Sequence, residues 1–255
     1  MCCDKIIMKL IIVILSVMLF LNGLGFSGLV RNEVYSSPDE MIFSVRDTPY
    51  NHTFTYWVEK WFDWFLSYPI SPREDYSPTL CSQNQNINEV WMLVDGDDLP
   101  TIKSPGEIRD CKVPAGKALL VQIVGSNCST DEGYNTTAEL FNCAQWILND
   151  TSLQFHASID GIQVMNTEKN PGDKEKYYVK PFLTNLTYPS DNKYGAHGGT
   201  FRGMEGGYFL FVKPLEVGNH TVFYDEYVKK RAPDGEYDQR ISKVTYNLQI
   251  VNMTK

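Results

Sequence analysis

The sequence predicts a mainly β protein, an antiparallel β-sandwich of the immunoglobulin-like or jelly-roll-like kind, with about two helices packed on it and a membrane-targeting helix before it. From residue 151 onward, apolar and polar residues alternate in short segments that are separated by turn residues. Short strands joined by turns favour an antiparallel sandwich over a parallel α/β sheet. Upstream of residue 151, two segments instead have the period of amphipathic helices.

The N-terminus has the pattern of a membrane-targeting segment. Lys5 and Lys9 precede an apolar run from Leu10 to Val30. Its densest part has the length of a signal-peptide core, whereas the whole run is long enough for one transmembrane helix. Residues 1–30 are therefore predicted to be a signal peptide, cleaved after Ser27, or a retained anchor. In both cases the chain beyond them is exported, with residues 31–50 as a linker and residues 51–255 as the exported domain.

Seven Asn-x-Ser/Thr acceptor sites follow the apolar run, where chance predicts about two. The excess predicts N-glycosylation, and therefore an extracellular or cell-surface protein, either secreted or held by a single N-terminal anchor. The predicted acceptors are Asn51, Asn127, Asn135, Asn149, Asn185, Asn219 and Asn252.

The cysteines agree with export. Cys2 and Cys3 precede the apolar run, and an even set of four follows it, which allows three disulfide pairings. We favour Cys81–Cys111 and Cys128–Cys143, because sequential pairs close local loops. A metal site made by all four thiolates is the alternative, but the C-x-x-C spacing typical of such sites is absent from the sequence.

An aromatic segment predicts the first helix, over residues 54–67. Trp57, Trp61, Trp64 and Phe65 lie at i, i+4, i+7 and i+8, and Pro69 ends the pattern. The tryptophans form either the core face of a helix on a sheet or a surface for a membrane interface or a carbohydrate. We favour the core face. A capping box formed by Thr136 and Glu139 begins the second helix, over residues 137–148.

Eight short segments have the composition or alternation of strands, and Asp160-Gly161 is a two-residue hairpin turn between two of them. The predicted strands cover residues 90–94, 117–124, 153–159, 162–164, 177–183, 207–212, 220–224 and 243–251.

Several motifs together resemble a family of uncharacterised exported proteins of bacteria and archaea. They are the Trp-rich helix, the Arg109-x-Cys111-x-Val-Pro-Ala-Gly-Lys117 segment, Ile159-Asp-Gly161, and Gly207-Tyr208 followed by Pro214-Leu and Gly218-x-His220-Thr-Val222. The similarity covers about residues 55–251 and implies secretion and a β-rich fold. It implies no activity and no catalytic residues. The stretch from Pro214 to Val222 also resembles strand connections of immunoglobulin-like domains, which is a likeness of fold alone.

The charge and the motifs exclude some function classes. A net charge of −8 and a pI near 5.0 argue against nucleic acid as a partner, because phosphates require clustered Lys and Arg. The nucleophile, zinc-protease and phosphate-loop motifs are absent from the sequence. The acidic turn of Asp95, Asp97 and Asp98 is a candidate calcium site or a solvated turn, and we predict no other cofactor.

These observations predict a non-enzymatic cell-surface or secreted protein for binding, adhesion or envelope structure. Its partner would be a cell-envelope component, a glycan or a surface protein, with membrane contact through the N-terminal segment if that segment is retained. The alternatives are an extracellular hydrolase acting on glycans or peptides and a metal- or ligand-carrying module. Two convergent carboxylates in a pocket, or His197 beside another titratable group, would favour the hydrolase.

Overall fold

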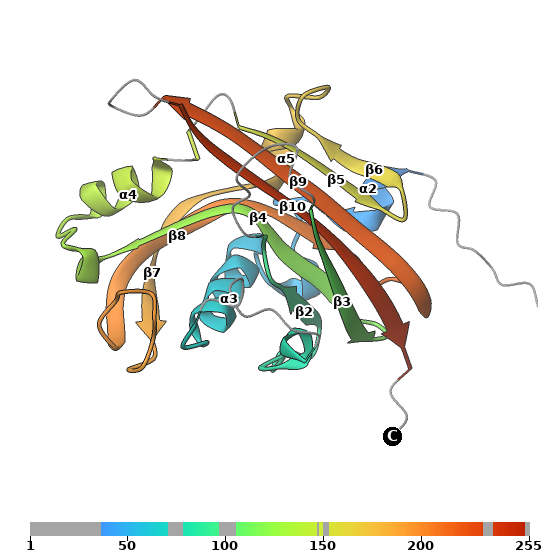
Figure 1. The fold of residues 1–255 in the computed structure, drawn as a ribbon, viewed down its shortest axis with the longest axis horizontal. Helices are drawn as coiled ribbons and strands as arrows, with labels where there is room; N and C mark the ends of the chain where they lie inside the picture. Colours follow the sequence, from blue (N-terminus) through green and yellow to red (C-terminus); the bar gives the residue numbers. More distant parts are fainter. Residues whose placement is uncertain are drawn as a thin grey trace, which may run out of the picture. The chain divides into compact units, whose positions relative to one another are not determined.

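The computed structural model describes residues 37–70, 79–96, 106–146, 148–149, 153–231 and 237–252, apart from the side chains of 228–231 and 237–241. The described chain is mainly β and contains two five-stranded sheets (Figure 1). The predicted N-terminal targeting segment lies outside these residues, and no described helix is long and apolar enough to cross a membrane.

The first sheet has the order β1-β8-β4-β2, and β7 also pairs with β8. All its pairs are antiparallel except β2 with β4. Its strands are β1 (Ile42–Phe43), β2 (Val90–Leu93), β4 (Ala118–Ser129), β7 (Tyr178–Tyr188) and β8 (Gly199–Val212).

The second sheet has the order β3-β10-β9-β5-β6, and its β3–β10 pair is parallel. Both sheets are therefore mixed, and the prediction of a wholly antiparallel fold is wrong in this respect. The strands are β3 (Glu107–Pro114), β5 (Gln154–Ile159), β6 (Ile162–Asn166), β9 (Gly218–Arg231) and β10 (Tyr237–Val251). The hairpin turn between β5 and β6 is confirmed, because Asp160 and Gly161 both have positive φ, at 49° and 79°.

The first predicted helix is α3 (Phe54–Leu66), which Thr53 caps by accepting a hydrogen bond from the Tyr56 N–H. Its tryptophans Trp57, Trp61 and Trp64 are 2%, 0% and 6% exposed. The Trp61 ring lies edge-on to Phe209 of β8, with centroids 5.8 Å apart. The core interpretation is confirmed, and the membrane-interface and carbohydrate-stacking interpretations are wrong.

The second predicted helix is α4 (Thr137–Gln145), which begins with the expected capping box. Its inner residues Leu140 and Ala144 pack with Cys128 and Met204. Both favoured disulfides are present: Cys81 binds Cys111 of β3, and Cys128 of β4 binds Cys143 of α4.

Residues 37–50, which lie within the predicted linker, belong to the fold. They contain the short helix α2 (Pro38–Met41) and strand β1, whose Ile42 pairs with Val212. Met41 and Ile42 are buried. Two buried residues are too few to give a readable period, so the sequence pattern did not reveal this strand. A further short helix, α5 (Asp173–Tyr177), lies between β6 and β7.

Candidate functional site

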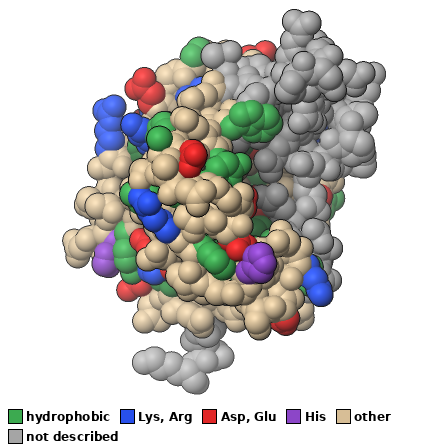
Figure 2. All heavy atoms as spheres, turned by 90° about the vertical axis from the view of Figure 1, so that its left-hand side faces the viewer, with side chains coloured by type: hydrophobic (Ala, Val, Ile, Leu, Met, Phe, Trp, Pro, Cys, Tyr) green, Lys and Arg blue, Asp and Glu red, His purple; other side chains and the backbone are tan. Residues whose placement is uncertain are grey.

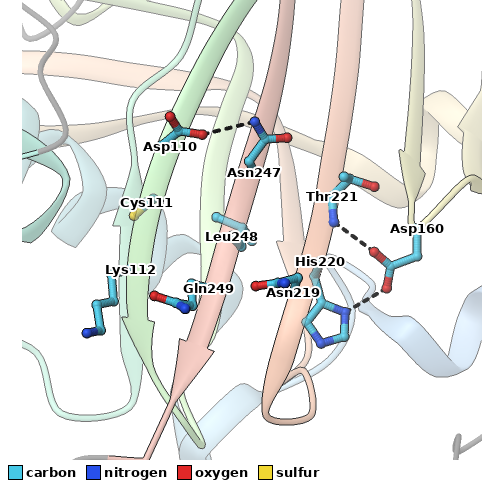
Figure 3. A pocket seen from close by; sticks show the side chains of 10 residues that line it. All are labelled: Asp110, Cys111, Lys112, Asp160, Asn219, His220, Thr221, Asn247, Leu248 and Gln249. Atoms are coloured by element: carbon cyan, nitrogen blue, oxygen red, sulfur yellow. Dashed lines mark hydrogen bonds and ion pairs between the residues drawn. The ribbon is translucent and has the colours of Figure 1, made fainter.

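The outer face of the second sheet carries a hollow of about 540 Å³, which we call the sheet hollow (Figure 3). Alternate residues of β3, β10 and β9 face outward there, because successive side chains of a strand point to opposite faces. The lining residues are Asp110, Cys111, Lys112, Asp160, Asn219, His220, Thr221, Asn247, Leu248 and Gln249.

Amide and carboxylate groups dominate the exposed part of this lining. Asn247 Nδ2 donates a hydrogen bond to Asp110 Oδ1 over 2.9 Å, between strands whose register makes the two residues direct partners. Asn219 and Gln249 are direct partners on the next strand pair. Because these side chains stand on paired strands, the sheet holds their donors and acceptors at fixed spacings.

His220 fastens the rim of the sheet hollow. Its Nδ1 lies 2.6 Å from Asp160 Oδ2, its Nε2 lies 2.9 Å from the Glu216 carbonyl oxygen, and the Thr221 N–H donates to Asp160 Oδ1. Both ring nitrogens are therefore engaged: Nδ1 holds the β5–β6 turn against β9, and Nε2 contacts the connection that precedes β9. This role is structural, and it leaves no free ring nitrogen for acid–base chemistry.

A second cavity, of about 520 Å³, lies beside the C-terminal end of α3, and we call it the α3 cleft. The lining residues are Phe65, Leu66, Asn127, Asp131, Glu132, Tyr188, Lys193, Tyr194, Gly195, Ala196 and His197. These described residues include no serine, threonine or cysteine, so none of them is a side-chain nucleophile of that kind.

The structure places His197 beside a titratable group in this cleft. Its Nδ1 lies 2.7 Å from Asp131 Oδ1, and its backbone N–H donates to Asp131 Oδ2 over 2.7 Å. These contacts lower the pKa of Asp131, the backbone hydrogen bond most of all. The His197 side chain is 85% exposed and lies at the rim of the cleft. Its contacts with Asp131 hold the glycine-rich segment of residues 195–199 in place.

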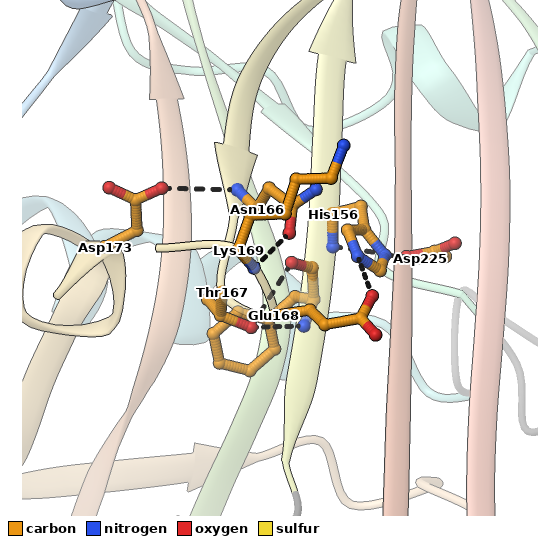
Figure 4. Close-up of polar contacts among 8 residues, drawn as sticks. His156, Asn166, Thr167, Glu168, Lys169, Asp173 and Asp225 are labelled. Carbon is orange, nitrogen blue, oxygen red and sulfur yellow. Dashed lines mark hydrogen bonds and ion pairs between the residues drawn. The ribbon is translucent and has the colours of Figure 1, made fainter. Parts of the chain in front are cut away.

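His156 forms a third contact with an aspartate (Figure 4). Its Nδ1 lies 2.8 Å from Asp225 Oδ1, and its Nε2 lies 3.7 Å from Glu168 Oε2. The backbone N–H of His156 also donates to Asp225. The contact ties β5 to β9 and to the turn that follows β6. The sequence predicts the strand over residues 153–159 but does not identify these partners.

Asp95 is the one residue of the predicted calcium site within the described chain, because Asp97 and Asp98 lie outside it. Asp95 is buried, at 2% exposure, where a solvated turn was the alternative. Its carbonyl oxygen accepts a hydrogen bond from Arg109 Nη1 over 2.7 Å. The described residues contain no group of three or more His, Cys, Asp or Glu placed to hold a metal ion. Calcium binding stays a prediction.

Six of the seven predicted glycosylation acceptors are exposed, and Asn127 is partly buried. Asn219 lines the sheet hollow and Asn127 lines the α3 cleft, so a glycan at either residue would lie in a cavity. On the face drawn in Figure 2, acidic, basic and hydrophobic side chains are scattered among polar ones and do not gather into one patch.

No protein-family model and no curated protein matches this chain. The resemblance to exported proteins of bacteria and archaea therefore stays a prediction. The functional proposals below rest on the geometry of the two cavities.

Proposed function

We propose that this is an exported, non-enzymatic binding protein with a two-sheet sandwich fold, whose sheet hollow holds a hydroxyl-rich ligand. The ligand class is a glycan, either free or carried by a cell-envelope component or surface protein. The observation that carries this proposal is the group of amide, carboxylate and ammonium side chains that paired strands hold across the sheet hollow.

Sugars suit such a lining, because each sugar hydroxyl both donates and accepts hydrogen bonds. Asn and Gln side chains offer a donor and an acceptor in one plane, a carboxylate offers two acceptors, and Lys offers donors. Phe223 lies two residues after Thr221, on the same face of β9, and is partly buried. It offers an apolar ring beside the polar groups.

Two features support export. The disulfides Cys81–Cys111 and Cys128–Cys143 are typical of proteins that fold in oxidising compartments. Six predicted acceptors for N-linked glycans lie exposed. The N-terminal segment, in this proposal, directs the chain to the cell surface or beyond.

The test is saccharide binding by the purified full chain. A panel of neutral and acidic oligosaccharides is screened, and the affinity of the best binder is measured by calorimetry. The variant Asn247→Ala/Gln249→Ala removes two hydrogen-bonding groups and should weaken binding about tenfold or more, at about 1 kcal/mol for each bond. Gln163→Ala, an exposed change on β6 of the same sheet, is the control and should leave the affinity unchanged.

Asn219 complicates this test, because a glycan attached there would compete for the sheet hollow. The measurements are therefore made on glycosylated protein and on protein from a host that adds no glycans. The proposal fails if neither form binds any saccharide, or if the double variant binds as tightly as the control.

The contact between His197 and Asp131 favours a second candidate, an extracellular hydrolase acting on glycans or peptides. A histidine oriented by a carboxylate through Nδ1 leaves Nε2 to exchange protons with a substrate or water. Turnover of chromogenic glycosides or peptides that His197→Ala abolishes would favour this candidate over simple binding.

A further inference from the structure

Three aromatic rings meet at the α3 cleft. They belong to Phe65 of α3, Tyr188 at the end of β7, and Tyr194 in the loop between β7 and β8. The ring centroids lie 6.4 Å apart for Phe65 and Tyr194 and 6.2 Å apart for Tyr188 and Tyr194. The Tyr194 hydroxyl donates to the Phe65 carbonyl oxygen over 3.2 Å, which fixes the loop on the helix. Tyr194 is the most open of the three.

Two fixed carboxylates stand beside these rings. The two hydrogen bonds from His197 lower the pKa of Asp131, so this group is ionised at neutral pH. Glu132 Oε2 accepts a hydrogen bond from the Ser129 N–H over 2.6 Å. Among the described lining residues, the lysine or arginine is Lys193, an exposed residue whose backbone N–H donates to the Pro69 carbonyl oxygen.

Carboxylates contribute negative potential at Tyr188. Burial is the main cause that raises the pKa of the Tyr188 hydroxyl to about 12. The carboxylates of Glu132 and Asp131 add to the shift, and a hydrogen bond with Ser129 opposes it. Burial disfavours a charge of either sign, whereas the contribution of the two carboxylates favours a cation over an anion at this place.

Glu205 is a buried neighbour of the cleft. It is the direct strand partner of Asn127, which lines the cleft, so the two side chains lie on the same face of the first sheet. Glu205 is 1% exposed, and its Oε1 has no hydrogen-bond partner among the described residues. Burial raises the pKa of Glu205, and this residue lies outside the lining of the cleft, so the negative charge of the cleft comes from Asp131 and Glu132.

We propose that the α3 cleft binds an organic cation, namely a quaternary or methylated ammonium group. Such groups are held by aromatic faces through cation–π attraction and by nearby carboxylates, and they need no directed metal ligands. The rings of Tyr188 and Tyr194, with Asp131 and Glu132 beside them, supply both kinds of contact. This proposal is independent of the sheet hollow.

The test compares choline with its uncharged isostere, the alcohol in which a quaternary carbon replaces the nitrogen. The two molecules share size and shape, so calorimetry on the full chain isolates the charge. We expect choline to bind about five- to thirtyfold more tightly than the isostere, which corresponds to cation–π energies of about 1–2 kcal/mol. Raising the salt concentration should weaken choline binding alone.

Variants locate the site. Tyr194→Ala should lose most of the choline affinity, whereas Tyr194→Phe keeps the ring and should retain it. Glu132→Gln keeps the hydrogen bond to Ser129 and should weaken choline binding without changing the isostere. Tyr56→Ala removes a ring from the opposite end of α3 and should change neither affinity. Thermal melting confirms that each variant folds.

A glycan at Asn127 would fill the cleft, so the titrations are repeated on Asn127→Gln. Choline binding by either protein, with the expected charge dependence, supports the proposal. The proposal is overturned if neither protein binds choline, if the isostere binds equally well, or if Tyr194→Phe loses as much affinity as Tyr194→Ala.

Discussion

Glu205 shows what burial does to a single ionisable residue. Burial, chiefly, and then the carboxylates of Asp63 and Glu59 on α3, raise the pKa of Glu205 well above its usual range. The folded protein therefore keeps a proton on this carboxyl group that the unfolded chain releases near the ordinary pKa of glutamate. The stability that depends on this proton is present below the ordinary pKa and is lost as the pH rises toward the raised pKa.

We therefore predict that Glu205 makes the free energy of unfolding fall as the pH rises above the ordinary pKa of glutamate toward the raised pKa in the folded protein. Glu205→Gln, which is neutral at every pH, should remove this part of the slope, as measured by urea unfolding across the range. Glu139 provides a contrast, because hydrogen bonds from Thr136 and Asn135 lower its pKa. Glu139→Gln should change the slope of stability against pH on the acid side alone, because the stability that depends on this carboxylate is present at neutral pH and is lost as the pH falls. An unchanged slope in Glu205→Gln would contradict the prediction.

The histidines show the limit of reading residues one at a time. Three of the four, His156, His197 and His220, each lie against an aspartate that is far away in the sequence. His197 is a candidate from the sequence, but its partner Asp131 lies 66 residues away. No local pattern connects such residues, because the contact depends on which strands and loops become neighbours.

At the scale of elements, α3 was the most predictable part of the fold. The period of its apolar residues can be read from neighbouring positions, and the capping residue Thr53 and the terminating Pro69 lie next to it in the sequence. Its bulky apolar residues fall on one face, which is the face that is buried. The structure also explains why these buried positions hold tryptophan and not another large apolar residue. Trp57, Trp61 and Trp64 each donate an indole N–H to a backbone carbonyl outside the helix, at Pro49, Leu93 and Gln83.

We predict that Trp61→Ala lowers the free energy of unfolding by about 3–5 kcal/mol, because it empties a fully buried site between α3 and β8. It also leaves the Leu93 carbonyl oxygen without this donor. Trp146→Ala is the matched control. That side chain is 58% exposed, so its removal should cost less than about 1 kcal/mol. Urea unfolding measures the free energy of unfolding of both variants. If the two variants lose the same amount of stability, the assignment of Trp61 to the core is contradicted.

Strand β3 was not predicted from the sequence, because its pattern of apolar residues is hidden. Its sequence has the composition of a polar connection, because four of its residues are charged: Glu107, Arg109, Asp110 and Lys112. In the structure, however, residues of β3 alternate between exposed and buried. The buried member of this charged set is Arg109, at 2% exposure. An arginine on the inner face hides the period of two, because hydrophobic patterning counts it as a surface residue.

For the whole molecule, Arg109 connects the two sheets. It stands on β3 of the second sheet, and its Nη1 donates to the carbonyl oxygens of Val94 and Asp95, which follow β2 of the first sheet. Nη1 also lies 3.3 Å from the Tyr246 hydroxyl of β10, and Nη2 is paired with Glu107. One planar group thus serves several acceptors, which lysine does not reproduce.

We predict that Arg109→Met destabilises the protein by about 3–5 kcal/mol, because it leaves buried carbonyl oxygens and the Glu107 carboxylate without this partner. Arg109→Lys should also lose stability, since an ammonium group lacks the fork of donors. Arg46→Met, an exposed change, should stay within about 0.5 kcal/mol. Thermal and urea unfolding provide the comparison. A loss no greater than that of Arg46→Met would show that Arg109 does not hold the sheets together.

The sequence by itself determined the properties that depend on near neighbours. These are the β-rich class, the α3 helix and its core face, the α4 capping box and the Asp160-Gly161 turn. The tertiary structure decided which strands pair, including the parallel pairs β2–β4 and β3–β10, and it brought Asp110 to Asn247 and Asp131 to His197. Strand pairing joins residues that are distant in the chain, and its free energy depends on the whole packed core. Both cavities follow from that pairing.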